Sequence, residues 1–270
     1  MSRTEKRNPR TTNFNKESTV TMLQIINDEN MNSVRAVGDA IEDIAKAVDA
    51  VTEAFLRGGR LIYVGAGTSG RMAVMDAAEC PPTFGVDYDT VITVMAGGRD
   101  AMFKAAEGVE DSAELGRGDL LDKNPTNLDV VMGISASGNA EYVASAMRAA
   151  REIGCVTISL SSNEDCKIGR IADIPIFVDT GAEVISGSTR MKAGNSQKFV
   201  LNMITTCAMA KTGKVYENLM INLRPTNIKL KGRMIGIVAE ICGVDDDEAL
   251  RLLEENDFSI RKVFEKFGKV

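Results

Sequence analysis

The sequence predicts an α/β fold in which a parallel sheet lies between two layers of helices, followed by a small helical module at the C-terminus. Short apolar runs alternate with helical patterns between residues 61 and 178. These runs are predominantly apolar, which is typical of parallel strands that are buried on both faces. The last part of the chain, from about residue 230, shows helical patterns only. Together, these observations favour a three-layer sandwich with an appended helical bundle.

The expected strands end in loops rich in glycine and hydroxyl-bearing residues. The strands cover residues 61–64, 91–95, 130–134, 155–160 and 174–178. The helical patterns between them cover residues 71–78, 101–109 and 140–153. Because ligands of such sheets bind beyond the carboxyl ends of the strands, we expect the functional site among these loops.

Further helices are expected on both sides of this alternation. Residues 1–16 are polar and predict an irregular arm, and Ser18 or Thr19 is expected to cap a short helix that ends near Ile26. Apolar residues then recur at alternating spacings of three and four from Val34 to Phe55, which predicts one amphipathic helix. Later helices are expected at residues 191 to about 211, 233–242, 246–255 and 259–267.

We therefore divide the chain into three parts. These are an N-terminal arm with helices (1–50), a central domain (51–215) and a C-terminal helical module (216–270). The spacing of Gly243, Ala249, Leu253 and Asn256 resembles that of ubiquitin-associated three-helix modules. We interpret this module as a packing unit.

The charge and hydropathy of the chain argue against several classes of partner. The net charge of −6 offers no electrostatic support for nucleic-acid binding. No apolar run approaches the ~18 residues that a membrane-spanning helix requires. No charged segment followed by an apolar one opens the chain, so we expect no secretory signal and a cytoplasmic location.

The cysteine and histidine counts restrict the chemistry. The five cysteines are odd in number and widely spaced, so we expect free thiols in a reducing compartment. Histidine is absent from the chain, which excludes a Ser–His triad, a histidine base and a histidine-ligated metal. Any acid–base chemistry must therefore use carboxylates, Lys, Tyr or Cys. We expect neither a metal nor a cofactor.

The glycine-rich turn after the first strand is the central motif. Gly65, Gly67 and Gly70 fit the pattern G-x-G-x-x-G between a strand and a helix, which directs backbone N–H groups and a helix N-terminus at an anion. A dinucleotide site would also need an acidic residue at the end of the second strand, but residues 94–98 contain none. Hydroxyl-bearing loops also follow the third and fourth strands, so a single phosphomonoester is favoured.

Four longer motifs follow one another along the chain: Gly65–Arg71, Asp76–Gly85, Glu107–Ser112 and Gly187–Gly194. Together they closely resemble the N-acetylmuramic acid 6-phosphate etherases, a family with the sugar isomerase (SIS) fold. Shorter matches occur at residues 4–9, 26–29, 202–203 and 213–220, so that the resemblance covers about residues 4–230. It implies an SIS-type three-layer sandwich.

The resemblance also implies an activity. Such enzymes cleave the D-lactyl ether at C3 of N-acetylmuramate 6-phosphate, giving N-acetylglucosamine 6-phosphate and D-lactate, without a metal or redox cofactor. They act as homodimers with the site near the subunit interface. In the open-chain sugar, loss of the C2 proton gives an enolate that expels lactate, and water then adds. One base and one acid are needed, and two carboxylates in different environments supply both.

The motif match assigns the catalytic roles. Glu79 is expected to protonate the departing lactate oxygen and then activate water, and Glu110 is expected to remove the C2 proton. We also expect Glu79 in the last turn of its helix and partly buried, because the negative end of the helix dipole and burial both disfavour the anionic form. Glu107 competes with Glu110 for the role of base. On spacing alone, without the family motif, solvated surface acids are the favoured interpretation of Glu79 and Glu110.

The substrate-binding residues are expected in the loops. Thr68, Ser69, Ser135, Ser137 and Gly138 are the candidates for binding the phosphosugar, and Lys192 for balancing the charge of its phosphate or lactate carboxylate. The family usually has Ala-Ser-Gly-Arg-Thr-Pro where residues 136–141 stand here, with Asn139 and Ala140 in place of Arg and Thr.

Two alternative functions remain open at this point. This altered loop favours a non-catalytic sugar-phosphate sensor, similar to the glucokinase regulatory proteins of the same fold. An aldose–ketose isomerase of this fold would also need a base at C2, although the segment Glu79–Pro82 argues against it.

Overall fold

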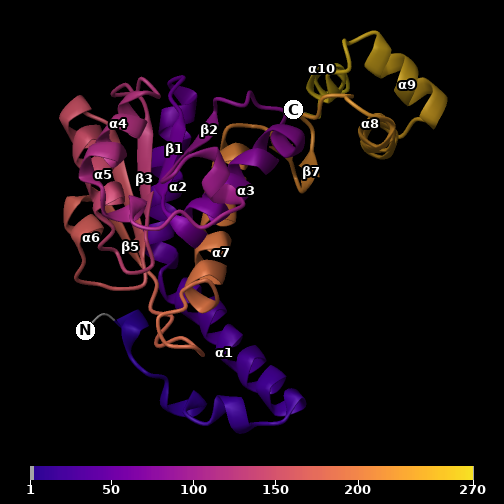
Figure 1. The fold of residues 1–270 in the computed structure, drawn as a ribbon. Coiled ribbons are helices and arrows are strands. Elements are labelled where there is room, and N and C mark those ends of the chain that lie inside the picture. Colours follow the sequence, from indigo (N-terminus) through magenta and orange to yellow (C-terminus); the bar gives the residue numbers. More distant parts are fainter. Residues whose placement is uncertain (1–2, 270) are drawn as a thin grey trace.

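Within residues 3–269, which the computed structural model describes, five parallel strands form the central sheet (Figure 1). They are β1 (Leu61–Gly65), β2 (Val91–Met95), β3 (Val130–Ile134), β4 (Val156–Ser161) and β5 (Ile174–Phe177). Their order across the sheet is β2-β1-β3-β4-β5, and each neighbouring pair is parallel. The predicted α/β fold is confirmed, and each strand begins and ends within one residue of its predicted position.

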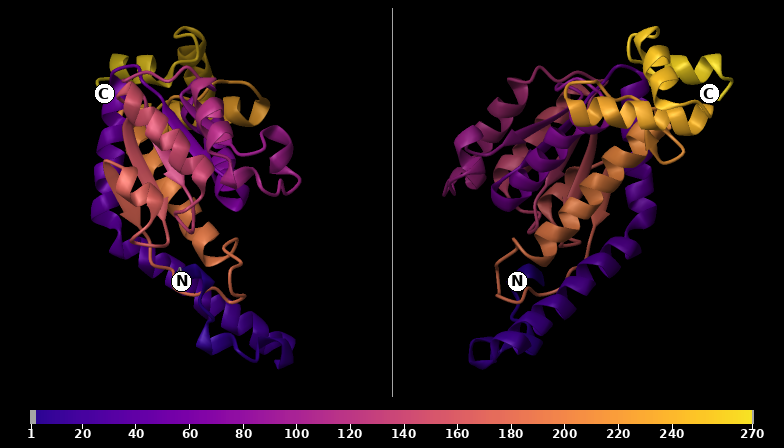
Figure 2. Two further views of the ribbon diagram at one scale, coloured as in Figure 1. Left: turned by 60° about the vertical axis from the view of Figure 1, so that its left-hand side comes forward. Right: turned by 90° about the vertical axis from the view of Figure 1, so that its right-hand side faces the viewer.

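Helices cover both faces of the sheet, as Figure 2 shows. One layer consists of α1 (Thr19–Asp39), α2 (Ile41–Leu56), α3 (Gly67–Phe84) and α7 (Lys192–Lys211). The other consists of α4 (Ala113–Leu121), α5 (Glu141–Ile153) and α6 (Lys167–Ile171). Along β1, Leu61 and Tyr63 join the first hydrophobic core, whereas Ile62 and Val64 join the second. Since both faces of the strand are buried, every position is apolar.

The N-terminal helices differ from the prediction. The helix expected to end near Ile26 continues to Asp39, and the single helix expected from Val34 to Phe55 is divided at Ala40. Ser18 caps α1 as predicted, with its Oγ accepting a hydrogen bond from the N–H of Thr21 at 3.2 Å. The polar stretch after Ile26 stays helical because α1 packs against α7 and buries two polar side chains, Glu29 and Ser33, in that contact.

Helix α3 is longer than predicted. It begins at Gly67 and runs to Phe84, so it extends past the expected range of residues 71–78 and includes Pro81 and Pro82. The helix ends at Gly85, which adopts the left-handed conformation and donates its N–H to the carbonyl of Pro81 at 2.9 Å. The side chain of Asn222 also donates to the carbonyl of Phe84 at 2.6 Å. A segment after α7 thus supplies a hydrogen-bond donor to a carbonyl group that has no partner within the helix.

The segment between β2 and α4 also differs from the prediction. Instead of a helix over residues 101–109, two short 3₁₀ turns, Arg99–Met102 and Val109–Asp111, stand on either side of an irregular loop. Residues 105–107 have no regular structure, and Gly108 adopts the left-handed conformation, at φ 76°, directly before the second turn. Helix α4 follows, with Ser112 as its N-cap, and was not predicted.

The predicted C-terminal helices are present in the described residues. They are α8 (Ile228–Cys242), α9 (Asp246–Glu254) and α10 (Ile260–Lys266), preceded by an unpredicted antiparallel hairpin of β6 (Val215–Tyr216) and β7 (Leu219–Met220). These elements enclose a third hydrophobic core that includes Met234, Leu253 and Phe264. Figure 1 shows this module at one end of the sandwich. The domain boundary at residue 216 stays a prediction. No helix among residues 3–269 combines the length and the hydropathy needed to cross a bilayer.

Candidate active site

A cavity of about 320 Å³ lies at the carboxyl ends of β1 and β3. In a sheet of this strand order, the chain turns to opposite sides of the sheet after these two strands, and this crevice is the usual place for a ligand. Five predicted site residues line the cavity: Thr68, Ser69, Glu110, Ser135 and Ser137. The remaining lining residues are Glu5, Ala66, Gly67, Ile134, Ala136, Ala140, Gly187 and Thr189.

The turn from β1 into α3 forms the first wall of the cavity. A Cβ on Gly65 would lie 2.8 Å from the N atom of Gly70, and one on Gly70 would lie 2.9 Å from the carbonyl oxygen of Gly65, so strand end and helix start approach closely only without side chains. Ala66, the N-cap, makes no side-chain hydrogen bond to the first turn. The first N–H groups of α3 are therefore open to an anion, beside the hydroxyls of Thr68 and Ser69.

The loop after β3 forms the second wall. Ser135 Oγ accepts the N–H of Gly138 at 3.1 Å, and the side chain of Asn163 donates to the carbonyl of Ala136 at 3.0 Å. Gly138 has φ +70°, and a Cβ there would lie 2.3 Å from Sγ of Cys166. Gly138 therefore packs against Cys166 and is not among the residues that line the cavity. Ser135 and Ser137 do line it.

The third wall comes from segments distant in sequence. Glu110 lies on the 3₁₀ turn after Gly108, and Glu5 lies on a 3₁₀ turn (Arg3–Glu5) of the N-terminal arm. The arm is held against the loop after β5, where the N–H of Gly187 donates to the carbonyl of Thr4 at 3.2 Å. The sequence interpretation missed Glu5 as a site residue, although the motif at residues 4–9 was a signal for it.

Lys192, which was expected to bind the substrate, is not among the residues that line this cavity. Its side chain is only 2% exposed, and its Nζ forms an ion pair with Glu29 of α1. Its N–H and that of Ala193 donate to the carboxylate of Glu183, at 3.1 and 3.0 Å. Burial raises the pKa of Glu183, and these two N–H groups act against that rise. Lys192 thus joins α7 to α1.

Glu79 is also not among the residues that line the cavity. It is exposed and lies ten residues beyond Ser69 on α3, which corresponds to about 15 Å along the helix axis. The expected position in the last turn is wrong, because α3 continues to Phe84, and in the single chain Glu79 is not partly buried. One chain therefore does not bring Glu79 and Glu110 together.

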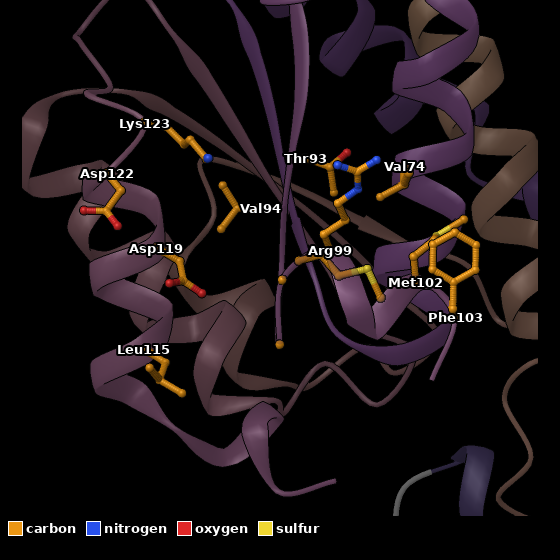
Figure 3. Close-up of a pocket in the computed structure, with 13 residues that line it drawn as sticks. Val74, Thr93, Val94, Arg99, Met102, Phe103, Leu115, Asp119, Asp122 and Lys123 are labelled. Atoms are coloured by element: carbon orange, nitrogen blue, oxygen red, sulfur yellow. The ribbon is translucent and has the colours of Figure 1, made fainter. Parts of the chain in front are cut away.

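A larger cavity of about 790 Å³ lies against the edge strand β2 (Figure 3). Figure 3 shows Asp119 and Lys123 on one side of it and Arg99 and Met102 on the other. None of the predicted site residues lines it. We take the smaller cavity as the candidate site because it lies between β1 and β3 and gathers the hydroxyls, the helix N-terminus and Glu110. Among residues 3–269, no group of three or more His, Cys, Asp or Glu is placed to hold a metal ion.

Comparison with solved structures supports the fold. A protein of E. coli CFT073 is 17% identical, with a TM-score of 0.55 over 75% of this chain and 97% of that one. A phosphoheptose isomerase from Francisella tularensis is 15% identical, with a TM-score of 0.55 over 71% of this chain and 98% of that one. Residues 43–151 match the model of the glucokinase regulatory protein N-terminal SIS domain.

Comparison with curated proteins shows the family. The N-acetylmuramic acid 6-phosphate etherase of Clostridioides difficile (strain 630) is 47% identical over 96% of this chain and 85% of its own length. That of Clostridium botulinum (strain Loch Maree / Type A3) is 50% identical over the same shares. That of Yersinia pestis (strain Pestoides F) is 49% identical over 95% of this chain and 87% of its own. With such identity over nearly its whole length, the chain belongs to the N-acetylmuramic acid 6-phosphate etherase family.

Proposed function

We propose that this protein cleaves the D-lactyl ether of N-acetylmuramic acid 6-phosphate, acting as a carbon–oxygen lyase. The products are D-lactate and N-acetylglucosamine 6-phosphate. The observation that carries the proposal is the 47–50% identity to etherases over nearly the whole chain. The cavity between β1 and β3 agrees with it, because an open helix N-terminus and five hydroxyl side chains suit a phosphomonoester.

The proposed chemistry is an elimination followed by hydration. Once the C1 aldehyde is free, the C2 proton is acidic, and Glu110 removes it to give an enolate. The enolate re-forms the aldehyde as it expels lactate from C3, and Glu79 protonates the departing oxygen. Glu79 then removes a proton from water, which adds to C3, and Glu110 returns a proton to C2. Thr68, Ser69, Ser135 and Ser137 hold the phosphate.

We infer that a second copy of the chain supplies Glu79 to the site. Glu79 is exposed on α3, and apolar side chains are exposed on the same helical layer, including Leu23 at 61% and Met75 at 44%. The N-terminal part of α1 also projects beyond the sandwich (Figure 1). Apolar surface of this kind favours association, and a homodimer gives Glu79 of one protomer access to the cavity of its partner.

We also infer that the reaction belongs to peptidoglycan recycling in the cytoplasm. All five cysteines are free, as in proteins of a reducing compartment. Burial raises the pKa of the Cys80 thiol to about 12 and that of Cys155 to about 11, so these two thiols are unreactive.

Release of D-lactate tests the proposed activity. We expect the purified protein to release D-lactate from N-acetylmuramic acid 6-phosphate, and Glu79→Ala and Glu110→Ala each to lower the rate about 10²–10⁴-fold, as for loss of a general acid or base. Glu107→Ala is the matched control, because Glu107 precedes Glu110 by three residues and is not among the residues that line the cavity. Tight phosphosugar binding without lactate release would instead establish the sugar-phosphate sensor, which the etherase relatives do not favour.

A further inference from the structure

The proposed elimination needs a free aldehyde at C1, and the sugar carries this carbon as a cyclic hemiacetal. In the hemiacetal, the C2 proton has no adjacent carbonyl to stabilise an enolate. Opening the ring requires removal of the proton on O1 and delivery of a proton to O5. An enzyme that performs this step needs a carboxyl group or another acid–base side chain at the sugar end of the site.

We propose that Glu5 is this group: the carboxylate of the N-terminal arm opens the sugar ring before Glu110 acts. Glu5 and Glu110 are the ionisable residues among the described residues that line the cavity. The chain contains no histidine to do this work. This inference rests on the proposed function, since it assigns a further step at the same site.

The position of Glu5 is defined by contacts on both sides of it. The N–H of Arg3 donates to the side chain of Asn163 at 2.7 Å, and the guanidinium of Arg3 pairs with Asp179. The carbonyl of Thr4 accepts the N–H of Gly187. A Cβ on Gly187 would lie 3.0 Å from Oε2 of Glu5, so the carboxylate rests against a backbone without a side chain. Glu5 forms no ion pair within residues 3–269.

Electrostatics determines which end of the substrate Glu5 faces. The phosphate is dianionic, and a carboxylate repels it, so the phosphate binds at the other two walls, at the N-terminus of α3 and the hydroxyls of Ser135 and Ser137. Glu5 then faces the sugar ring, whose hydroxyl groups are hydrogen-bond donors that a carboxylate accepts.

The proposed step balances its protons. Oε of Glu5 takes the proton from O1 as the C1–O5 bond breaks and C1=O1 forms. The electron pair of the broken bond goes to O5, and the protonated Glu5 transfers its proton to O5. The carboxylate is regenerated, and no other reactant is consumed. Glu110 then meets an aldehyde with an acidic C2 proton.

Interconversion of the anomers of N-acetylglucosamine 6-phosphate tests this step apart from lactate release. The two anomers exchange through the open chain, and NMR exchange spectroscopy measures the rate. In a Glu110→Gln protein, which lacks the base at C2, we expect the exchange to remain accelerated over buffer. Adding Glu5→Gln should reduce it at least about tenfold. Glu17→Gln is the control, because Glu17 directly follows the arm, is exposed and is not among the cavity residues.

The outcomes separate the two proposals. In lactate release, Glu5→Gln should lower kcat at least about tenfold with little change in KM, and an unchanged thermal midpoint would show that the arm is intact. Anomer exchange that persists in the Glu5→Gln, Glu110→Gln protein would overturn the assignment of Glu5. So would a Glu5→Gln variant that changes KM alone, since that result indicates a role in substrate binding only. Absence of lactate release from the unmodified protein would reject the proposed function instead, whatever the exchange rate.

Discussion

Single side chains fix the positions of the strands that carry the site. Asp129 stands just before β3, where its carboxylate accepts the N–H groups of Arg60 at 2.8 Å and Thr126 at 2.9 Å. The Arg60 side chain also donates to it at 2.8 Å. The carboxylate therefore joins the beginnings of β1 and β3, the two strands whose far ends form the cavity. Burial acts to raise the pKa of Asp129, but the hydrogen bonds from Arg60 and Thr126 outweigh it and lower the pKa.

This lowered pKa predicts a defined pH dependence of stability. The contribution of Asp129 is fully present above about pH 4, the usual pKa of Asp, and is lost as the pH falls through its lower pKa in the folded chain. We expect Asp129→Asn to lower the free energy of unfolding by about 2–3 kcal/mol near neutral pH, because it removes charge-assisted hydrogen bonds. The deficit should shrink in acid. Urea unfolding at several pH values measures it.

The control for this prediction is Asp122→Asn. Asp122 is exposed at the end of α4 and forms no ion pair among the described residues. Its substitution should leave stability within about 0.5 kcal/mol at every pH. A deficit of equal size at all pH values in Asp129→Asn would show that shape, and not charge, explains the effect.

At the scale of elements, buried polar contacts attach α1 to α7 and to the N-terminal arm. The ion pair between Lys192 and Glu29 joins the two helices, and Ser33 Oγ donates to the carbonyl of Lys192 at 3.1 Å. The side chain of Asn8, on the arm, donates to Glu29 at 3.0 Å. The same arm carries Glu5 to the cavity, so these contacts connect helix packing with the site.

Removal of the ammonium group separates a structural role of Lys192 from the substrate-binding role expected from the sequence. We expect Lys192→Met to lower the free energy of unfolding by about 1–3 kcal/mol, because Glu29 loses its buried cationic partner and keeps only the ion pair with the exposed Arg10 at 3.2 Å. Replacing Glu29 by Met as well should recover part of this loss. Denaturant unfolding of the single and double variants measures the coupling.

Lys211→Met is the matched control on the same helix. Lys211 forms an exposed ion pair with Asp49, and such pairs contribute about 0–1 kcal/mol. If Lys192→Met kept its full stability and lost affinity for the phosphosugar, the lysine would be a substrate ligand after all.

At the scale of the whole molecule, the separation of Glu79 and Glu110 predicts activity by complementation. In a symmetric dimer with shared sites, a Glu79→Ala chain paired with a Glu110→Ala chain forms one site with both glutamates and one site with neither. Random mixing of the two inactive variants should therefore restore about a quarter of the unmodified activity. D-lactate release after joint refolding or co-expression measures it.

Two controls accompany the mixing experiment. A doubly substituted Glu79→Ala, Glu110→Ala chain mixed with the Glu79→Ala chain should stay inactive. Sedimentation should show a dimer in every sample. If the mixtures are dimeric and recover no activity, both glutamates of a site come from the same subunit, and the shared site is wrong.

The local sequence pattern by itself determined the strands and the loops that follow them. The mainly apolar strands predicted the parallel sheet, because strands buried on both faces favour apolar residues at most positions. The glycines at residues 65–70 predicted the open helix N-terminus, and the hydroxyls at residues 135–137 predicted the facing wall. Each of these features depends on neighbours within a few residues, and the cavity brings them together.

Only the tertiary structure decided what depends on partners far along the chain. Helix α1 continues through a polar stretch because Lys192 of α7 forms an ion pair with the buried carboxylate of Glu29. The same ion pair allows Lys192 to be buried. Glu5 reaches the cavity because the arm is bound to the loop after β5, more than one hundred and seventy residues away. No local periodicity encodes such pairings, since a buried polar group is stable wherever the fold supplies its partner.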